Sequence, residues 1–212
     1  MPVTELALLH LKNHRQISPE TKCALVSGAS AQARFAGYPV RLYSQIEDPS
    51  YIYLLGGWDS VSQHMNEWIP SPTNQNIMSS LADEMEVVWM FHVEIEPASG
   101  EMRSASSPLD APVLAIERCF VGEEEKGEFE DTMMRVKGCV EECTAPRMLR
   151  CGWRIDYPEG REETHEEFVM LSGWEDVEDH LRFLETGSED DKCWKNWTEG
   201  VDVRHARLME VV

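Results

Sequence analysis

The sequence predicts an α+β protein made of two ferredoxin-like (βαββαβ) repeats that form a pseudo-dimeric α+β barrel. A ten-residue block occurs twice, the same order of strand-like and helix-like segments surrounds each copy, and several strands are apolar on both sides. A βαββαβ unit covers one face of its sheet with helices and leaves the other face open. Because a large bare apolar face is unfavourable in water, we expect each repeat to cover the open face of the other.

The repeated block reads LGGWDSVSQH at 55–64 and LSGWEDVEDH at 171–180, with five identities in ten positions. The identical positions are Leu55, Gly57, Trp58, Val61 and His64, which recur as Leu171, Gly173, Trp174, Val177 and His180. An apolar run precedes each block, and a strand with a histidine, His92 or His205, closes each repeat. Such self-similarity indicates an internal duplication. We expect Trp58 and Trp174 to be packing anchors of the two copies.

The first repeat is predicted over residues 1–96. A helix is expected over 18–35, with Ser18 as its cap and Pro19 in its first turn. A second helix is expected from residue 59 or 60 towards 85, broken at Pro70-Ser71-Pro72. Strands are expected at 5–11, 40–47, 51–58 and 87–96.

The second repeat is predicted over residues 112–212, after a linker at 97–111 that is rich in Ser, Ala, Pro and Gly. Helices are expected over 127–143 and from Val177. In the first of these, four apolar residues at helical spacing are predicted to share a buried face. They are Met133, Val136, Val140 and Cys143. Strands are expected at 112–120, 147–155, 166–174 and 202–211.

The composition is typical of a folded protein, with 212 residues of which 42% are hydrophobic and 8% aromatic. The formal charge of -20, from 19 Lys+Arg and 39 Asp+Glu, disfavours nucleic acid and anionic membranes as partners. No apolar run approaches the roughly 20 residues that span a bilayer. The six cysteines lack CxxC spacing, so we expect reduced, mostly buried thiols in a soluble cytoplasmic protein. The protein is expected to be a monomer with an internal pseudo-dimer, or a homodimer.

The block GWDSV at 57–61 is followed by polar and aromatic residues and closed by a histidine strand. These residues are His64, Trp68, Ser71, Asn74 and His92. Together they resemble the antibiotic-biosynthesis-monooxygenase type of dimeric α+β barrel, and most of all its fungal members with two units in one chain. That family includes cofactor-free oxygenases of polyphenolic polyketides, haem-degrading enzymes, decarboxylases, cyclases and stress-response proteins. The resemblance covers both repeats and implies a ligand cavity between helices and sheet, but it selects no reaction.

The second helix of each repeat is predicted to turn a histidine towards the sheet. At helical spacing, one face carries Val61, His64, Met65, Trp68 and Ile69 in the first repeat, and Val177, His180, Leu181 and Leu184 in the second. An imidazole with a pKa near working pH could act as a general base on a phenol or an activated C–H. The alternative is a histidine that only packs and hydrogen-bonds to the sheet. His64 and His92 are the candidate catalytic residues.

Further candidates concern substrate binding. The resemblance implies that Trp68 and Asn74 line the pocket, and Tyr43 on a strand could contact an aromatic ligand. In the second repeat, His180 and His205 are the corresponding candidates. There, Leu184 and Asp190 replace Trp68 and Asn74, so the two pockets are expected to differ.

No Gly-rich phosphate loop, GxSxG elbow, HExxH pair or zinc signature occurs, so we expect no nucleotide, flavin or metal cofactor. Residues and resemblance together favour a cofactor-independent enzyme of secondary metabolism that acts on an aromatic or polyketide-like substrate, with monooxygenation as the leading reaction. The alternatives are a decarboxylase or cyclase for the same substrates, and a non-catalytic ligand-binding or stress-response barrel.

Overall fold

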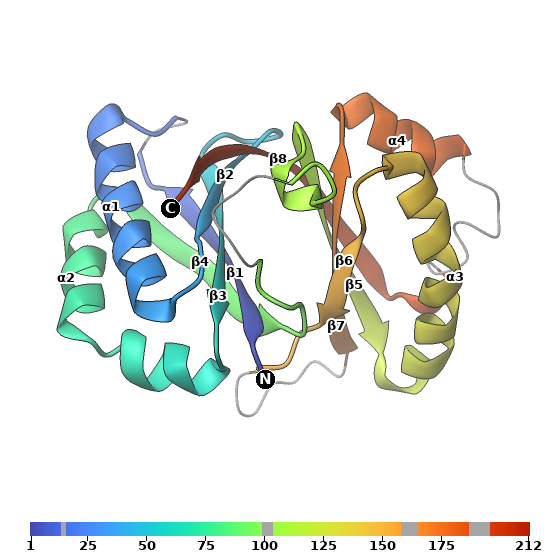
Figure 1. Cartoon of the computed structure of the whole chain (residues 1–212), viewed down its shortest axis with the longest axis horizontal. Coiled ribbons are helices and arrows are strands. Elements are labelled where there is room, and N and C mark those ends of the chain that lie inside the picture. Colours follow the sequence, from blue (N-terminus) through green and yellow to red (C-terminus); the bar gives the residue numbers. More distant parts are fainter. Residues whose placement is uncertain (14–15, 99–103, 158–164, 187–195) are drawn as a thin grey trace. The chain divides into compact units, whose positions relative to one another are not determined.

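The computed structural model describes residues 1–13, 16–98, 104–157, 165–186 and 196–212. It divides into two compact units, one of Met1–Met102 with Leu208–Val212 and one of Arg103–Arg207. Each unit has helices on one face of an antiparallel sheet (Figure 1). The predicted fold class, α+β with two βαββαβ repeats, is confirmed by the order of the elements.

The first unit follows the predicted order, and its hydrogen-bonded strands lie in the order β4-β1-β3-β2. Its strands are β1 (Val3–Leu11), β2 (Arg41–Gln45), β3 (Tyr51–Trp58) and β4 (Met85–Val93). Its helices are α1 (Pro19–Ala36), the π-helical turn η1 (Gln63–Trp68) and α2 (Pro72–Leu81). The predicted strand 51–58 agrees with β3 at both ends, and the predicted strand 5–11 agrees with the end of β1, whereas the remaining boundaries shift by a few residues.

The ends of α1 follow from local chemistry. Ser18 Oγ accepts a hydrogen bond from the backbone N–H of Thr21 at 3.0 Å, and Pro19 is the first helical residue, as predicted. The helix stops at Gly37, which has φ +80 and donates its N–H to Ala33 O. This left-handed conformation suits glycine, since it lacks a Cβ.

The second helix of the first unit breaks at the predicted prolines, but its first part is not α-helical. In η1 the N–H of Ile69 donates to His64 O at 2.9 Å, a bond that spans five residues. The wider turn keeps His64 and Trp68 buried, while Met65 is 40% exposed. The prediction that Met65 belongs to the buried face is therefore wrong.

In the second unit the strand order is β8-β5-β7-β6. Its strands are β5 (Val113–Gly122), β6 (Arg150–Trp153), β7 (His165–Trp174) and β8 (Gly200–Val211). Its helices are α3 (Lys126–Thr144), α4 (Val177–Thr186) and the 3-10 turns η2 (Pro108–Asp110) and η3 (Glu123–Glu125). In α4, Leu181 is 44% exposed, so its predicted place on the buried face is wrong as well.

The cysteine prediction holds only in part. Cys119 is buried, but Cys23 and Cys143 are exposed. In α3 the buried stripe continues from Val140 to Thr144, four residues on, which turns Cys143 to solvent. Cys193 lies outside the described residues. The five described cysteines form no disulfide with one another.

The compact units do not follow the predicted repeat ranges at every point. The division falls within the predicted linker 97–111, and buried Pro108 and Leu109 in that segment belong to the second unit. At the other end, Val40 and Val212 exchange both backbone hydrogen bonds, at 2.7 and 2.9 Å. Because β8 is long, its pairing with β5 uses residues 200–206, and its last four residues, with Val212 after them, join the first unit.

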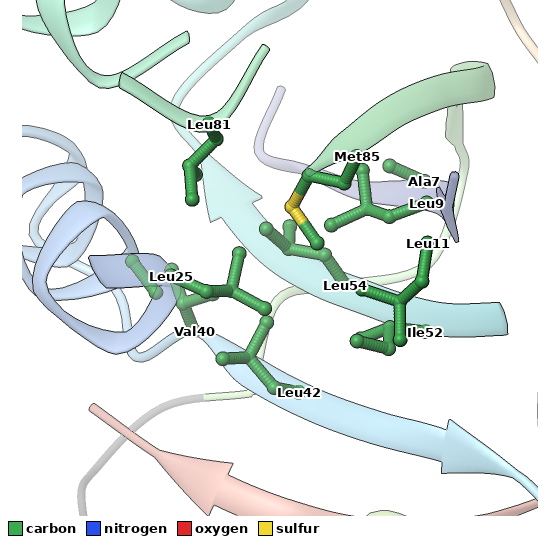
Figure 2. Packing of buried hydrophobic residues seen from close by; sticks show 11 residues of the cluster. Ala7, Leu9, Leu11, Leu25, Val40, Leu42, Ile52, Leu54, Leu81 and Met85 are labelled. Carbon is green, nitrogen blue, oxygen red and sulfur yellow. The ribbon is translucent and has the colours of Figure 1, made fainter. Parts of the chain in front are cut away.

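The core of the first unit lies between its sheet and α1 and α2 (Figure 2). Its buried members come from β1, α1, β2, β3, α2 and β4 and from the residue that precedes β2. They are Ala7, Leu9, Leu11, Leu25, Ala29, Val40, Leu42, Ile52, Leu54, Leu81 and Met85. Since strand residues alternate between faces, Ala7, Leu9 and Leu11 reach this core from one side of β1.

The two units repeat one another in register as well as in order. Trp58 pairs with Val3 in β3 and β1, and Trp174 pairs with Val113 in β7 and β5. Both tryptophans are buried, at 0% and 4% exposed. The two neighbourhoods are therefore alike, as a duplication requires.

Candidate functional site

A pair of buried histidines occupies the polar end of the first unit's core. His64 on η1 and His92 on β4 lie with Nδ1 and Nε2 2.8 Å apart, and the rings are 1% and 0% exposed. One nitrogen donates and the other accepts, so the two tautomers are coupled. The indole of Trp58 stacks on His64, with centroids 4.1 Å apart and planes 10° from parallel. The structure thus brings together the two predicted catalytic residues.

A third ionisable side chain, Glu5 on β1, joins this pair. Its Oε2 accepts hydrogen bonds from Gln32 Nε2 at 2.7 Å and from Trp58 Nε1 at 2.9 Å. It also lies 3.9 Å from His64 Nε2. Glu5 is 5% exposed. Sequence reasoning missed this residue, and the available signal was one acidic residue within the apolar strand VTELALLHL.

The approach of Glu5 and Gln32 depends on Gly56. This residue pairs with Glu5 across β1 and β3. A Cβ at position 56 would lie 2.6 Å from Gln32 Nε2 and 3.0 Å from Glu5 Oε2. The missing side chain therefore leaves the space in which this hydrogen bond forms.

Burial changes the acid–base behaviour of both groups. Burial, and next the charge of His92, lower the pKa of His64 from 6.5 to about 3. Burial raises the pKa of Glu5 above 4.5, although the hydrogen bond from Trp58, His92 and the hydrogen bond from Gln32 act in the opposite direction. His64 is consequently uncharged at neutral pH, and the expectation that its pKa lies near working pH is wrong. The protonated ring is therefore disfavoured at this position.

A cavity of about 540 Å³ reaches this polar end. Its apolar walls come from β1, α1, β3, α2 and β4, and include Ala7, Leu9, Leu25, Gly28, Ile77 and Met90. Its polar lining includes Glu5, Gln32, His64 and Asn74. Trp68 also lines it, beside Phe35 at 5.2 Å between centroids. The predicted pocket residues His64, Trp68 and Asn74 therefore meet at one cavity.

Asn74 helps to hold the break between η1 and α2. Its Nδ2 donates to Ile69 O at 3.0 Å, and its backbone N–H donates to the capping Ser71 Oγ at 3.1 Å. Oδ1 accepts no hydrogen bond from the described residues. Asn74 thus combines a structural contact with a free acceptor on a residue of the cavity lining.

Tyr43 does not join this site. It is fully buried on β2 and does not line the cavity. Its neighbour Leu42 belongs to the core under the helices, so the alternation of strand side chains turns Tyr43 to the opposite face.

The second unit contains a matching pair. His180 Nδ1 on α4 and His205 Nε2 on β8 lie 2.8 Å apart, and Trp174 stacks on His180 at 4.8 Å. His180 Nε2 has no hydrogen-bond partner among the described residues, and Glu117 Oε1 lies 3.5 Å from it. The indole of Trp174 donates to Ser172 Oγ at 2.8 Å.

Of the two residues predicted to make the second pocket different, only one lies in the described part of the chain. Leu184 on α4 is half-buried, whereas Asp190 lies outside the described residues. The residues that line the cavity described above all come from the first unit, as far as the chain is described.

Within the described residues, no three His, Cys, Asp or Glu side chains gather in a way that could hold a metal ion. A search of the same residues finds no helix with the length and hydropathy needed to cross a bilayer.

Comparison with known proteins gives structural matches only. No protein-family model matches the sequence, and no curated protein matches it either. A candidate monooxygenase of Fusobacterium nucleatum subsp. nucleatum is similar with a TM-score of 0.67 and 9% identity, over 99% of this chain and 93% of that one. An anthrone oxidase-like protein gives 0.68 and 10%, over 99% and 92%. A chlorite dismutase variant from Candidatus Nitrospira defluvii gives 0.54 and 7%, over 99% and 91%. At such identities the likeness shows a shared fold over the whole chain.

Proposed function

We propose that the protein is a cofactor-independent monooxygenase of secondary metabolism that binds an aromatic, polyketide-like substrate in the cavity of the first unit. The proposal includes the fungal, two-repeat antibiotic-biosynthesis-monooxygenase type that the sequence resembles. The observation that carries it is the cavity of about 540 Å³ that reaches His64. A core filled with side chains would have favoured a non-catalytic barrel instead.

The lining suits a flat, largely apolar ligand. A volume of this size is typical of small-molecule sites, which combine apolar walls with a few convergent polar groups. Here Leu9, Leu25 and Met90 are among the apolar walls, and the polar groups gather around Glu5 and His64. The ring of Trp68 adds an aromatic surface on which a substrate ring can stack.

The chemistry begins with one proton transfer and needs no bound cofactor. Removal of a proton from an acidic methylene leaves a carbanion that its aromatic neighbours delocalise, and this anion can pass electrons to O2. One oxygen atom then becomes the new carbonyl oxygen. The other leaves as water with the two methylene hydrogens, so atoms and electrons balance.

The residues around the cavity divide these tasks. His64 and His92 hydrogen-bond to each other at the polar end, and the uncharged His64 can relay a proton without holding it. Trp68 and Asn74 shape the pocket and orient the substrate. His180 and His205 form the equivalent pair of the second unit, where they serve packing under this proposal.

The fold neighbours suggest which substrates to test. One of them is named as a candidate monooxygenase and another as anthrone oxidase-like. Anthrones carry an acidic methylene between aromatic rings, which is the group that the proposed reaction requires.

The test is incubation of the protein with anthrones and phenolic acids under air and under nitrogen, with oxygen uptake and product mass as readouts. Wild type should turn over at least one substrate in air only, and His64→Ala should lose at least about tenfold in kcat/KM. His180→Ala, the matched change in the second unit, shows which unit holds the site. We expect little loss from it.

Other outcomes would redirect the assignment. Product formation under nitrogen would indicate a decarboxylase or cyclase. Ligand binding without any turnover would favour the non-catalytic barrel. Equal turnover by wild type and His64→Ala would remove His64 from the mechanism.

A further inference from the structure

Glu5 has the features of a reacting group rather than of a structural carboxylate. Both of its hydrogen bonds fall on Oε2, and no described residue donates a hydrogen bond to Oε1. The side chain lines the cavity while only 5% of its surface is exposed. One carboxylate oxygen is therefore held in place, and the other is available to a ligand.

A second buried glutamate shows what a structural role looks like in this chain. Glu167 on β7 is 2% exposed and is paired with two arginines, Arg118 and Arg154. These two cations compensate the cost of burying its charge. Among the described residues, the only basic group within 4.0 Å of Glu5 is His64, whose low pKa leaves it uncharged at neutral pH.

Residues of two other elements hold the Glu5 side chain in position. Trp58 on β3 and Gln32 on α1 donate to the same oxygen from two directions. Gly56 keeps clear the space that a side chain would need. These contacts fix the carboxylate at the polar end of the cavity.

We propose that Glu5 Oε1 is the atom that accepts the proton lost by the substrate, with His64 and His92 as its neighbours in the proton path. In this step the substrate C–H bond breaks, its electron pair stays on carbon as a delocalised carbanion, and an O–H bond forms at Oε1. The inference rests on the function proposed above and adds the identity of the base.

The geometry of β1 supports this placement. Glu5, Ala7 and Leu9 share one face of the strand, and all three line the cavity. At roughly 3.4 Å per residue they cover about 14 Å, which accommodates a three-ring aromatic molecule lying along the strand. Its central ring would lie over the small Ala7, and one of its edges would meet Glu5.

The electrostatic environment of Glu5 also favours its role as a base. The titratable groups that face Glu5 are His64 from η1 and His92 from β4, while Trp58 and Gln32 donate hydrogen bonds. Burial is the largest influence and raises the pKa of Glu5. A carboxylate with a raised pKa is a stronger base than one in water.

The experiment separates proton removal from oxygen chemistry. Anthrone is incubated with the protein in deuterated buffer under nitrogen, and exchange of its acidic methylene protons is followed by NMR. Wild type should accelerate exchange over buffer, and Glu5→Gln should lose at least about 100-fold of that acceleration. Glutamine keeps an oxygen that can accept from Trp58 and Gln32, and circular dichroism checks the fold. Glu117→Gln, the matched change beside His180, should leave exchange unchanged.

A second variant tests the base without removing it. The hydrogen bond from Gln32 lowers the pKa of Glu5, so Gln32→Leu should raise this pKa further. The acid limb of the exchange rate should then move to higher pH. A merely structural role for Glu5 would leave that limb where it is.

The outcomes distinguish this inference from the proposed function. Exchange that is absent in wild type, equal in Glu5→Gln, or unmoved in pH by Gln32→Leu overturns the role of Glu5. Exchange that depends on Glu5 without oxygen uptake in air upholds that role and rejects the monooxygenase. Oxygen uptake that survives in Glu5→Gln rejects the role of Glu5 and upholds the monooxygenase.

Discussion

The two units share a cluster of two histidines and a tryptophan but differ in the glutamate beside it. In each unit the histidines lie 2.8 Å apart, and a buried tryptophan stacks on one of them. Glu5 is opposite Gly56 and His92 in the sheet register, and the corresponding residue of the second unit is Ala115, opposite Ser172 and His205. The second unit instead carries Glu117, two residues further along the same face of its strand.

The change of glutamate alters the partners of both tryptophans. Trp58 donates to the Glu5 carboxylate, whereas Trp174 donates to the hydroxyl of Ser172. Ser172 occupies the register position of Gly56, where the first unit has no room for a side chain. Each unit therefore satisfies its indole N–H with a different set of residues.

The different position of the glutamate also changes the residue that corresponds to the cavity lining on β1. Ala7 lines the cavity, and its register equivalent is the larger Glu117. The buried positions of α1 and α3 recur at the same spacing, which matches Gly28 with Val136. The histidine cluster therefore belongs to the duplicated fold, whereas Glu5 and the small cavity residues Ala7 and Gly28 are specific to the first unit.

The largest expected effect tests the cost of burying His64. Its pKa falls from 6.5 when unfolded to about 3 when folded, so between these values the unfolded chain binds a proton that the folded chain does not. Its contribution to stability is present above pH 6.5 and is lost as the pH falls, by about 1.4 kcal/mol per pH unit. His64→Gln should remove this dependence. Urea unfolding of both proteins at pH 6.5, 5.5 and 4.5 provides the measurement.

Glu5 acts in the opposite sense. Its raised pKa means that the folded state takes up a proton before the unfolded state does, so the free energy of unfolding rises as the pH falls towards 4.5. That contribution is present in both proteins and cancels in their difference. Parallel pH profiles for wild type and His64→Gln would show that burial of His64 carries no such cost.

The next effect exchanges a residue between the units. Gly56→Ser installs the serine of the second unit, and its Cβ would collide with Gln32 Nε2 and crowd Glu5 Oε2. Losing the hydrogen bond between these two side chains should cost about 2–3 kcal/mol, because one partner is a buried carboxylate. Thermal or urea unfolding checks it. In a Gln32→Val background, which copies Val140 at the equivalent helix position, the cost should fall by more than about 1 kcal/mol. Additive costs would contradict the proposed clash.

A smaller effect compares the two tryptophans directly. Trp58→Phe and Trp174→Phe remove similar ring area. The first also removes a hydrogen bond that a carboxylate accepts, and the second removes one that a hydroxyl accepts. Hydrogen bonds to charged groups contribute about 1 kcal/mol more, so Trp58→Phe should be the more destabilising by that amount. Equal losses of unfolding free energy would indicate that Glu5 is no better an acceptor than Ser172. In a Glu5→Gln background, the two tryptophan substitutions should differ less in the unfolding free energy that they remove.

Much of the fold follows from local patterns in the sequence. The apolar run 51–58, bounded by Asp48-Pro49-Ser50, predicts β3 to the residue, and Ser18 with Pro19 predicts the start of α1. The duplication adds the βαββαβ order, because two copies that agree constrain each other. The π-turn of η1 escapes such reasoning, since it depends on how Trp68 and His64 pack rather than on an α-helical period.

The site is less visible in the sequence, because its contacts are distant along the chain. The sequence identifies His64 and His92 as candidates, but their direct hydrogen bond spans 28 residues and depends on the sheet register. Glu5 was missed because its partners, Gln32 and Trp58, are 27 and 53 residues away. One acidic residue in an apolar strand reads equally well as a solvent-facing position. The register of the strand decides whether such a residue is buried or faces solvent, and that register depends on pairing across the whole sheet.

The smallest expected effect compares the starts of the two long helices. Ser18 caps α1 through the N–H of Thr21, whereas α3 begins after the turn η3, and its cap residue Glu125 makes no capping hydrogen bond through its side chain. Ser18→Ala should therefore cost about 1 kcal/mol, and Glu125→Ala should stay within about 0.5 kcal/mol. Urea unfolding of the two variants measures both. If they lost the same stability, the first turn of α1 would be held by packing of Thr21 and Leu25 against the core rather than by its cap. The difference between the units would then begin at the sheet, with Glu5, and not at the helices that cover it.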